Sequence, residues 1–302
     1  ILRLGHIVND CDPALETARS LAEMMMGSDL ISAVKGEGRS TGEVRYSIKK
    51  LSTAPKDPFK VSLRNVSLEL RKGEILGIAG LAGNGQAELM DVLSGESLSE
   101  TAGSIEMEGQ IIGHMGPEKR RNLGLGFVPE ERLGHGAVPE MSLWENGFLT
   151  AARGQGLMAN GFIKTEKAKI FAMDIIKRFN VKTAGVESLA TSLSGGNLQK
   201  FIVGREIGQN PKVLIALQPT WGVDAGSAAF IHQALVDLAA KGTAVLMISQ
   251  DLDELFAVSG RIAVMCEGRL SKARRATETT VEQIGLLMGG MQDGSVHKEN
   301  AA

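Results

Sequence analysis

The sequence predicts an α/β fold in which helices cover a parallel β-sheet and an antiparallel sheet lies beside it. Three short runs, Ile75–Ala79, Val213–Leu217 and Ala244–Ile248, contain no polar side chain. Such runs are typical of parallel strands that are buried on both faces. Val66–Leu70 and Ser104–Glu108 instead alternate apolar and polar residues, which predicts half-buried antiparallel strands.

Two further sets of apolar residues recur at helical spacing. One lies between the second and third apolar runs and predicts a helix that connects two parallel strands. The other lies in the helix-rich region of residues 142–190, which we expect to form an inserted helical subdomain. The first set is Ile231, Ala234, Leu235 and Leu238, and the second is Ala168, Phe171, Ile175 and Ile176.

Length, composition and charge narrow the possible functions. The 302 residues suffice for one or two domains, and 43% hydrophobic with 23% charged residues is usual for a globular protein. The net charge of −2 gives no electrostatic case for nucleic acid as a partner. Cys11 and Cys266 fit a reducing cytoplasm better than a disulfide framework. The histidines lack metal-ligand spacing, and no apolar run reaches the ~18 residues of a membrane helix, so we expect neither a protein-only metal site nor a membrane crossing.

A segment near each end of the chain follows the same pattern. Leu4-Gly5-His6-Ile7 leads through Glu16-Thr17 to Met25-Met26-Gly27, and Glu267-Gly268-Arg269-Leu270 leads through Glu278-Thr279 to Leu287-Met288-Gly289. Each copy is typical of two short strands joined at the glycine and followed by an amphipathic helix. Chance similarity of short segments is the alternative to a true repeat.

A true repeat sets the domain boundaries. Residues 1–30 would be the tail of a preceding copy of the same domain, and residues 31–42, with several glycines, a linker. The main domain would cover residues 43–290, followed by a polar tail, 291–302, that we expect to be disordered. Because the chain begins with Ile1 and not with Met, we expect it to be a piece of a tandem protein that is cut near the end of its first half.

A glycine-rich turn follows the first apolar run. In a P-loop, G-x-x-x-x-G-K-[ST], backbone N–H groups surround a phosphate, the Lys neutralises it and the hydroxyl binds Mg²⁺. Here the two glycines have the right spacing, but Gln stands in place of Lys and Ala in place of Ser or Thr. A plain strand-to-helix turn is the alternative, and the G-x-G-x-x-G dinucleotide fingerprint is not satisfied. The candidate nucleotide-binding residues are Gly80, Gly83, Asn84, Gly85, Gln86 and Ala87.

The second motif is Leu193-Ser194-Gly195-Gly196-Asn197, followed by Leu198-Gln199-Lys200. It resembles the L-S-G-G-Q signature of ABC-type ATPases. Two glycines allow close approach, Ser194 offers a hydroxyl, and a helix that begins here directs its positive end outward. The alternative is an ordinary helix start, in which Ser194 is the N-cap of a helix that buries Leu198, Phe201 and Ile202.

From about Glu43 to Gly290, the chain resembles the C-terminal, second ATP-binding domain of a tandem ABC importer subunit of the simple-sugar and nucleoside uptake class. The segment Gly195–Lys200, together with Gln218-Pro219-Thr220, is most similar to that class. Residues 1–30 resemble the tail of the first domain of such a protein. The resemblance implies an ABC-type P-loop ATPase core with an inserted helical subdomain.

Two other segments keep the backbone-shaping residues of the family and depart from it in the chemical ones. The family has Asp-Glu-Pro-Thr where this chain has Leu217-Gln218-Pro219-Thr220, and Ser-His-Asp where it has Ser249-Gln250-Asp251. The resemblance thus implies loss of both carboxylates and of the histidine that contacts the γ-phosphate. A glutamine can orient a water molecule but cannot accept its proton. We therefore expect no catalytic residue, with Gln218 and Gln250 as degenerate positions.

The resemblance also implies partners, because two domains of the family enclose ATP head to tail. Leu193–Asn197 would complete the site of the first domain, and Asp224 would lie at the seam between the domains. Glu130, after Phe127-Val128-Pro129, would couple the nucleotide to membrane permease subunits, and a solute-binding protein would take part indirectly. ATP, with Mg²⁺ bound only through it, is the implied cofactor, and Phe59 is a candidate for stacking on adenine. The implied location is the cytoplasmic, inner face of the cell membrane.

Three function classes remain open at this point. The first is a transport subunit that supplies its signature to another domain and transmits motion to the membrane. The second is a regulatory module that senses nucleotide without turnover, and the third is a homodimeric ATPase with unusual residues. An ABC protein that acts on ribosomes or DNA is disfavoured by the near-neutral charge.

Overall fold

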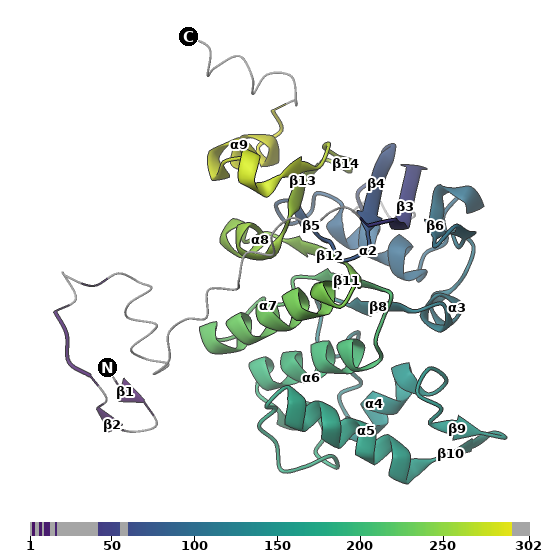
Figure 1. Ribbon diagram of the computed structural model, residues 1–302, viewed down its shortest axis with the longest axis vertical. Coiled ribbons are helices and arrows are strands. Elements are labelled where there is room, and N and C mark those ends of the chain that lie inside the picture. The colour runs from purple at the N-terminus through teal and green to yellow at the C-terminus, as the bar shows by residue number, and fades with distance from the viewer. Residues whose placement is uncertain are drawn as a thin grey trace.

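Figure 1 shows the computed structural model, which describes residues 2–3, 6–7, 9–12, 16, 42–54 and 60–291. Its central sheet has the strand order β14-β13-β5-β12-β11-β8, with β15 paired to β13. The pairings from β13 through β5, β12 and β11 to β8 are all parallel, so the three predicted apolar runs are adjacent parallel strands. The strands are β5 (Ile75–Ala79), β8 (Leu125–Val128), β11 (Val213–Leu217), β12 (Ala244–Ser249), β13 (Arg261–Cys266), β14 (Arg269–Leu270) and β15 (Arg274–Arg275).

The central strands are buried on both faces because their side chains alternate between two hydrophobic cores. In β11, Leu214 and Ala216 belong to a core that α6 and α7 complete, whereas Ile215 and Leu217 face a core shared with the antiparallel sheet. This double burial is the physical reason for the uninterrupted apolar runs.

The second sheet is antiparallel, with the order β4-β3-β6-β7. In β4, buried Val66, Leu68 and Leu70 alternate with exposed Ser67 and Glu69, which confirms the predicted half-buried strand. Helix α2, which follows the glycine-rich turn, packs its buried Leu89 and Leu93 into the same core. The strands are β3 (Val44–Leu51), β4 (Val66–Arg71), β6 (Ile105–Met107) and β7 (Gln110–Ile111), and the helix is α2 (Gln86–Ser94).

Helices α4 to α9 lie on the opposite side of the central sheet from the antiparallel sheet, or at one end of the molecule (Figure 1). Helices α6 and α7 pack on the sheet, and α4 and α5 extend beyond them with the hairpin β9–β10, within the region expected to be helix-rich. In α5, Ala168 and Ile175 are buried, while Phe171 and Ile176 are half-buried against the core. The bounds are α3 (Pro117–Asn122), α4 (Leu143–Ala151), β9 (Met158–Ala159), β10 (Phe162–Ile163), α5 (Thr165–Arg178), α6 (Gly195–Gly208), α7 (Ala225–Ala240), α8 (Leu252–Val258) and α9 (Val281–Met288), with 3-10 turns at Ala102–Ser104, Ala190–Ser192 and Ala276–Glu278.

The predicted fold class, α/β with a parallel and an antiparallel sheet, is confirmed. At the N-terminus, β1 (Leu2–Arg3) and β2 (His6–Ile7) form a short antiparallel hairpin. The helix expected before Gly27, most of the linker, Phe59 and the tail from residue 292 lie outside the described residues. Within the described part of the chain, no helix is long and apolar enough to cross a membrane.

Candidate functional site

The glycine-rich turn connects the end of β5 to the start of α2, and the side chain of Gln86 fills it. Gln86 Nε2 donates to the carbonyl oxygen of Leu81 at 2.8 Å, and Gln86 Oε1 accepts from the Asn84 N–H at 3.1 Å. The Gln86 side chain is buried, and a Cβ on Gly80 would lie 2.3 Å from its Nε2. The glutamine amide therefore takes up hydrogen-bonding groups of the turn, including an N–H of the kind that a P-loop directs at phosphate.

The turn is also held from outside by the hairpin between β13 and β14. Asn84 Oδ1 accepts from the Glu267 N–H at 2.8 Å, and the Gly268 N–H donates to the Asn84 carbonyl at 2.9 Å. Gly83 and Gly85 have φ of 79° and 108°, a region that residues with a Cβ rarely adopt. The backbone of the turn is curled, and this shape requires glycine at positions 83 and 85 because of their positive φ.

The ends of β11 and β12 bring Gln218 and Gln250 together. Gln218, at φ 51°, is buried, and its Oε1 lies 3.4 Å from the Gln250 N–H and 3.3 Å from the Ser249 hydroxyl. Because Ala79 is paired with Ser249 across β5 and β12, the glycine-rich turn begins at the same sheet edge. The structure thus groups Gln218 and Gln250 beside the turn Gly80–Ala87.

A buried carboxylate that the sequence analysis missed lies behind this group. Glu254 accepts hydrogen bonds from the hydroxyls of Thr220 and Ser249 and lies 2.8 Å from His232 Nε2. Burial alone raises the pKa of Glu254, but the hydrogen bonds from His232, Ser249 and Thr220 outweigh burial and leave this pKa below its usual value. Glu254 therefore connects the segment after β11 to the segment after β12. Its only sequence signal is Asp251-x-x-Glu254, which resembles an ordinary helix start.

The signature segment, Leu193–Asn197, lies at the start of α6 and faces outward. Ser194 and Gly195 are exposed, and Leu193, Gly196 and Asn197 are half-buried. Ser194 occupies the N-cap position, yet its side chain caps no backbone N–H; its hydroxyl accepts from Asn197 Nδ2 at 2.9 Å. The first N–H groups of this helix of 14 residues are left without a side-chain cap.

The loop from Trp221 to Asp224, called here the seam loop, packs beside the signature segment. Gln199 Nε2 donates to the Pro219 carbonyl at 2.7 Å, and a Cβ on Gly196 would lie 3.0 Å from Asp224 Oδ2. Asp224 accepts from the Ser227 N–H and hydroxyl at 2.9 and 2.7 Å and so caps α7. Burial raises the pKa of Asp224, but these hydrogen bonds and the charge of Lys200 outweigh it and lower this pKa. Among the described residues, no hydrogen bond joins the turn Gly80–Ala87 to the signature segment.

Replacing Asp224 by Ala tests how much this cap stabilises the domain. We expect the free energy of unfolding to fall by about 1 kcal/mol, because the first turn of α7 loses its side-chain acceptor. Equilibrium unfolding in urea, followed by circular dichroism, measures the loss. Asp224→Asn keeps an acceptor oxygen and should lose less than half as much; equal losses would show that the charge, and not the cap, stabilises the turn.

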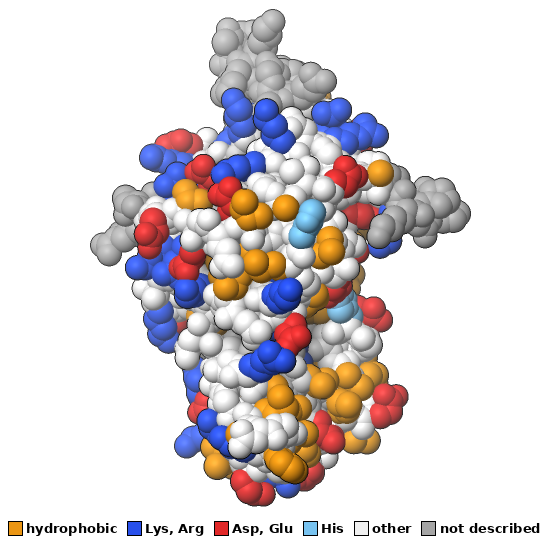
Figure 2. Space-filling model, turned by 90° about the vertical axis from the view of Figure 1, so that its right-hand side faces the viewer, with side chains coloured by type: hydrophobic (Ala, Val, Ile, Leu, Met, Phe, Trp, Pro, Cys, Tyr) orange, Lys and Arg blue, Asp and Glu red, His pale blue; other side chains and the backbone are white. Residues whose placement is uncertain are grey.

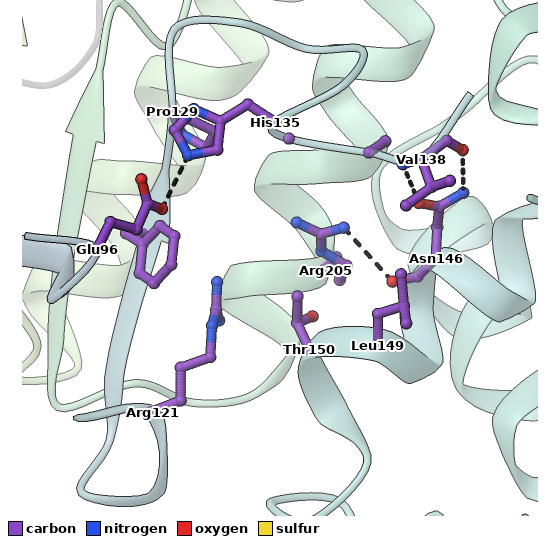
Figure 3. A pocket seen from close by; sticks show the side chains of 12 residues that line it. Glu96, Arg121, Pro129, His135, Val138, Asn146, Leu149, Thr150 and Arg205 are labelled. Carbon is purple, nitrogen blue, oxygen red and sulfur yellow. Dashed lines mark hydrogen bonds and ion pairs between the residues drawn. The ribbon is translucent and has the colours of Figure 1, made fainter. Parts of the chain in front are cut away.

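A groove lies between the end of β8 and the helices α4 and α6 (Figure 3). Arg121 and Arg205 point into it, and both pair with the fully buried Glu206, with Arg121 Nη1 2.6 Å from Glu206 Oε2. His135 Nε2 lies 2.8 Å from Glu96 Oε1 at the other side of the groove. Pro129 lines the groove, and the following residue, Glu130, is exposed at its edge.

The residues at the turn do not fit an ordinary Mg²⁺–phosphate group. Ala87, at the start of α2, and Leu217, at the end of β11, have no oxygen in their side chains and so cannot bind Mg²⁺. Leu217 is moreover buried in the hydrophobic core. Within the described residues, no group of three or more His, Cys, Asp or Glu side chains could hold a metal ion.

Comparison with known proteins gives the class of this chain. The family model described as "ABC transporter" matches residues 63–220, and the chain belongs to this family. It is 35% identical over 96% of its length to the nucleoside import ATP-binding protein NupA of Lactococcus lactis subsp. cremoris. It is also 34% identical over 99% of its length to the guanosine import ATP-binding protein NupO of Bacillus subtilis.

Both relatives are longer than this chain, and a solved structure shares its fold. The chain spans 57% of the length of NupA and 58% of that of NupO, so a large part of each relative has no counterpart here. Among solved structures, the dimeric post-hydrolysis state of the ATP-binding cassette MJ0796, bound to ADP and Pi, has a TM-score of 0.66 at 20% identity. The alignment covers 76% of this chain and 98% of MJ0796. At this identity the likeness concerns the fold alone.

Proposed function

We propose that this chain is the second, catalytically degenerate half of the ATP-binding subunit of an importer for a sugar or a nucleoside. Its signature segment acts on nucleotide held by the first ATP-binding domain of the same protein, whereas its own turn, Gly80–Ala87, turns over no ATP. Membrane permease subunits receive the resulting motion, and a solute-binding protein delivers the solute to them. The protein acts at the cytoplasmic face of the cell membrane.

The contrast between the two nucleotide-facing segments carries this proposal. In the signature segment, Ser194 and Gly195 are exposed, and no side chain caps the backbone N–H groups at the start of α6. The turn has Gln86 folded into it, and the nearby Gln218 amide is engaged with the end of β12. One segment is therefore available to an external phosphate, and the other is engaged by the chain's own side chains.

The tandem arrangement is supported by the two ends of the chain. β1 and β2 are separated by the two residues 4–5, and β13 and β14 by the two residues 267–268, with glycine second in both pairs. Both hairpins have the same antiparallel register. The alignment with NupO includes nearly all of residues 1–42 as well, and it leaves about two fifths of that protein outside. Trp221, on the seam loop, is 60% exposed, as expected of a residue that another domain covers.

Coupling to a membrane subunit is supported by the groove beside Glu130. The groove separates the sheet from the helical region, so a partner segment placed in it would contact both. Figure 2 shows the side of the molecule that lies to the right in Figure 1, and hydrophobic side chains gather on its lower part, where the helical region lies. In that region Leu149 and Phe162 are 49% and 78% exposed. Apolar surface of this kind is typical of a protein–protein contact.

The 302-residue chain by itself is expected to release no measurable phosphate from roughly millimolar MgATP. It lacks the Lys, the hydroxyl, both carboxylates and the histidine of a working site, and each charged hydrogen bond is worth about 1.5–3 kcal/mol. Losing several of them lowers the rate by at least about a thousandfold. A phosphate-release assay on the purified chain, with Gln218→Ala as the matched variant, measures this.

The same assay separates the other function classes. Turnover that disappears in Gln218→Ala would contradict the proposal and favour a homodimeric ATPase, above all if MgATP also dimerises the chain. MgATP binding at the turn without turnover, abolished by a bulky substitution at Gly83, would favour a nucleotide-sensing module. Phosphate release equal to that of a buffer blank in both proteins is the expected result.

A further inference from the structure

Burial lowers the pKa of the guanidinium in three arginines of the described chain, and one of the three has no partner there. Arg120 donates to four backbone carbonyls, and Arg205 is paired with Glu206. Arg132 is half-buried, and among the described residues its side chain has neither a carboxylate nor a carbonyl to bond. Withdrawing a cation from water without a partner costs stability. The Arg132 guanidinium is therefore available for a partner outside the described residues.

The Arg132 guanidinium lies against the backbone of the signature segment and of the seam loop. A Cβ on Gly195 would be 2.7 Å from Arg132 Nη1, and one on Gly222 would be 3.3 Å from Nη2. Gly195 is the first residue of α6, so the cation lies directly at the positive end of that helix. The two glycines leave the space that the guanidinium occupies, and any side chain at Gly195 would displace it.

The surroundings of Arg132 favour a multiply charged anion. The start of α6 has backbone N–H groups without a side-chain cap, because the Ser194 hydroxyl is bonded to Asn197. Asp224 lies near Gly196, but its hydrogen bonds among the described residues go to Ser227 at the start of α7, and none goes to Arg132 or to a backbone N–H of α6. A guanidinium next to an uncapped helix start matches phosphate better than a single carboxylate, because its planar fork binds two phosphate oxygens at once.

We infer that Arg132 binds a phosphate group of the nucleotide held by the opposing ATP-binding domain, beside the signature segment. The inference rests on the proposed function, which places that nucleotide opposite Leu193–Asn197. Arg132 is then a phosphate-binding residue that this chain supplies to a site on another domain. It lies in the loop after β8, only two residues beyond Glu130, so it also connects the bound phosphate with the groove.

The test uses the full-length protein with both ATP-binding domains, and MgATP as the probe. Arg132→Ala is expected to weaken MgATP binding at least about tenfold, the effect of one lost charge-assisted hydrogen bond. Arg132→Lys should weaken it less, because it keeps the charge and loses the fork. Arg275→Ala is the matched control, since Arg275 pairs with Glu278 on the surface. The melting temperature without nucleotide should be unchanged or raised in Arg132→Ala, while the ATP-induced rise shrinks.

A comparison variant, Ser194→Arg, separates this inference from the proposed function. If Ser194→Arg loses MgATP binding and Arg132→Ala does not, the inference fails and the proposed function stands. If neither variant loses binding, both fail. A nucleotide-free protein that Arg132→Ala destabilises by several degrees would also overturn the inference, because Arg132 would then make a structural contact.

Discussion

Replacing Ser194 by Arg in the full-length protein is expected to lower ATP hydrolysis by about a hundredfold or more. Ser194 is exposed at the uncapped start of α6, so the larger side chain fits without disturbing the core and fills the space that an external phosphate would occupy. Losing the close contact of the helix start with a phosphate costs about 3 kcal/mol, which corresponds to roughly two orders of magnitude in rate. Steady-state phosphate release, with and without the membrane partners, measures the effect.

The matched variant is Gln218→Ala, which changes a residue at the end of β11, beside the glycine-rich turn. Gln218→Ala should change hydrolysis less than about twofold, because the Gln218 amide accepts from Ser249 and Gln250 in its own chain and cannot take a proton from water. The asymmetry between the two variants is the decisive measurement. The reverse result, a large loss in Gln218→Ala and none in Ser194→Arg, would mean that the chemistry takes place on this chain's own turn.

The largest expected effect on stability follows from replacing Glu206 by Ala. The Glu206 side chain is fully buried and pairs with both Arg121 and Arg205. Its removal leaves two cations without their shared partner, and breaking a buried pair in this way costs about 3–5 kcal/mol. For a domain of this size, that loss lowers the melting temperature by roughly 10 °C. Urea unfolding measures the free energy, and Arg178→Ala, which breaks an exposed pair with Asp174, should cost less than about 0.5 kcal/mol.

The same ion group predicts how stability depends on pH. Burial alone raises the pKa of Glu206, but the charges of Arg121 and Arg205 outweigh burial and hold this pKa below its ordinary value. A depressed carboxyl pKa stabilises the fold above the unfolded value of about 4.3, and this stabilisation is lost as pH falls through the folded value. The wild-type chain should therefore lose stability below about pH 4.3 more steeply than Glu206→Ala. Parallel acid unfolding curves would contradict this assignment.

The apolar and alternating patterns were enough to predict the strands that have a simple environment. β5, β11 and β12 are buried on both faces, and β4 on one, so burial alone determines their residue types. β8 did not stand out, because its four residues include Gly126 and its identity as a strand depends on pairing with β11. The glycine-rich turn could also be predicted from the sequence, because a curled backbone needs glycine whatever surrounds it.

The candidate site was predictable only in its backbone. The order of the glycine turn, the signature segment and Pro219-Thr220 could be read from the residues, whereas the loss of catalytic side chains stays a prediction. The position of the Gln86 amide inside the turn could not, because an exposed glutamine has the same sequence context. Glu254 was hidden for a similar reason, since its partners come from α7 and from the ends of two strands.

The sequence by itself determined the α/β class and the apolar runs that form its parallel strands, because these depend on local residue type and spacing. Only the tertiary structure decided that Ser194 and Gly195 at the start of α6 are exposed and that Glu206 balances the charges of Arg121 and Arg205. It also decided that Arg132, which has no side-chain partner among the described residues, lies against Gly195 and Gly222. These features depend on burial and on charge pairs between residues far apart in the sequence. Their free energies depend on distances in space, which the order of residues does not contain.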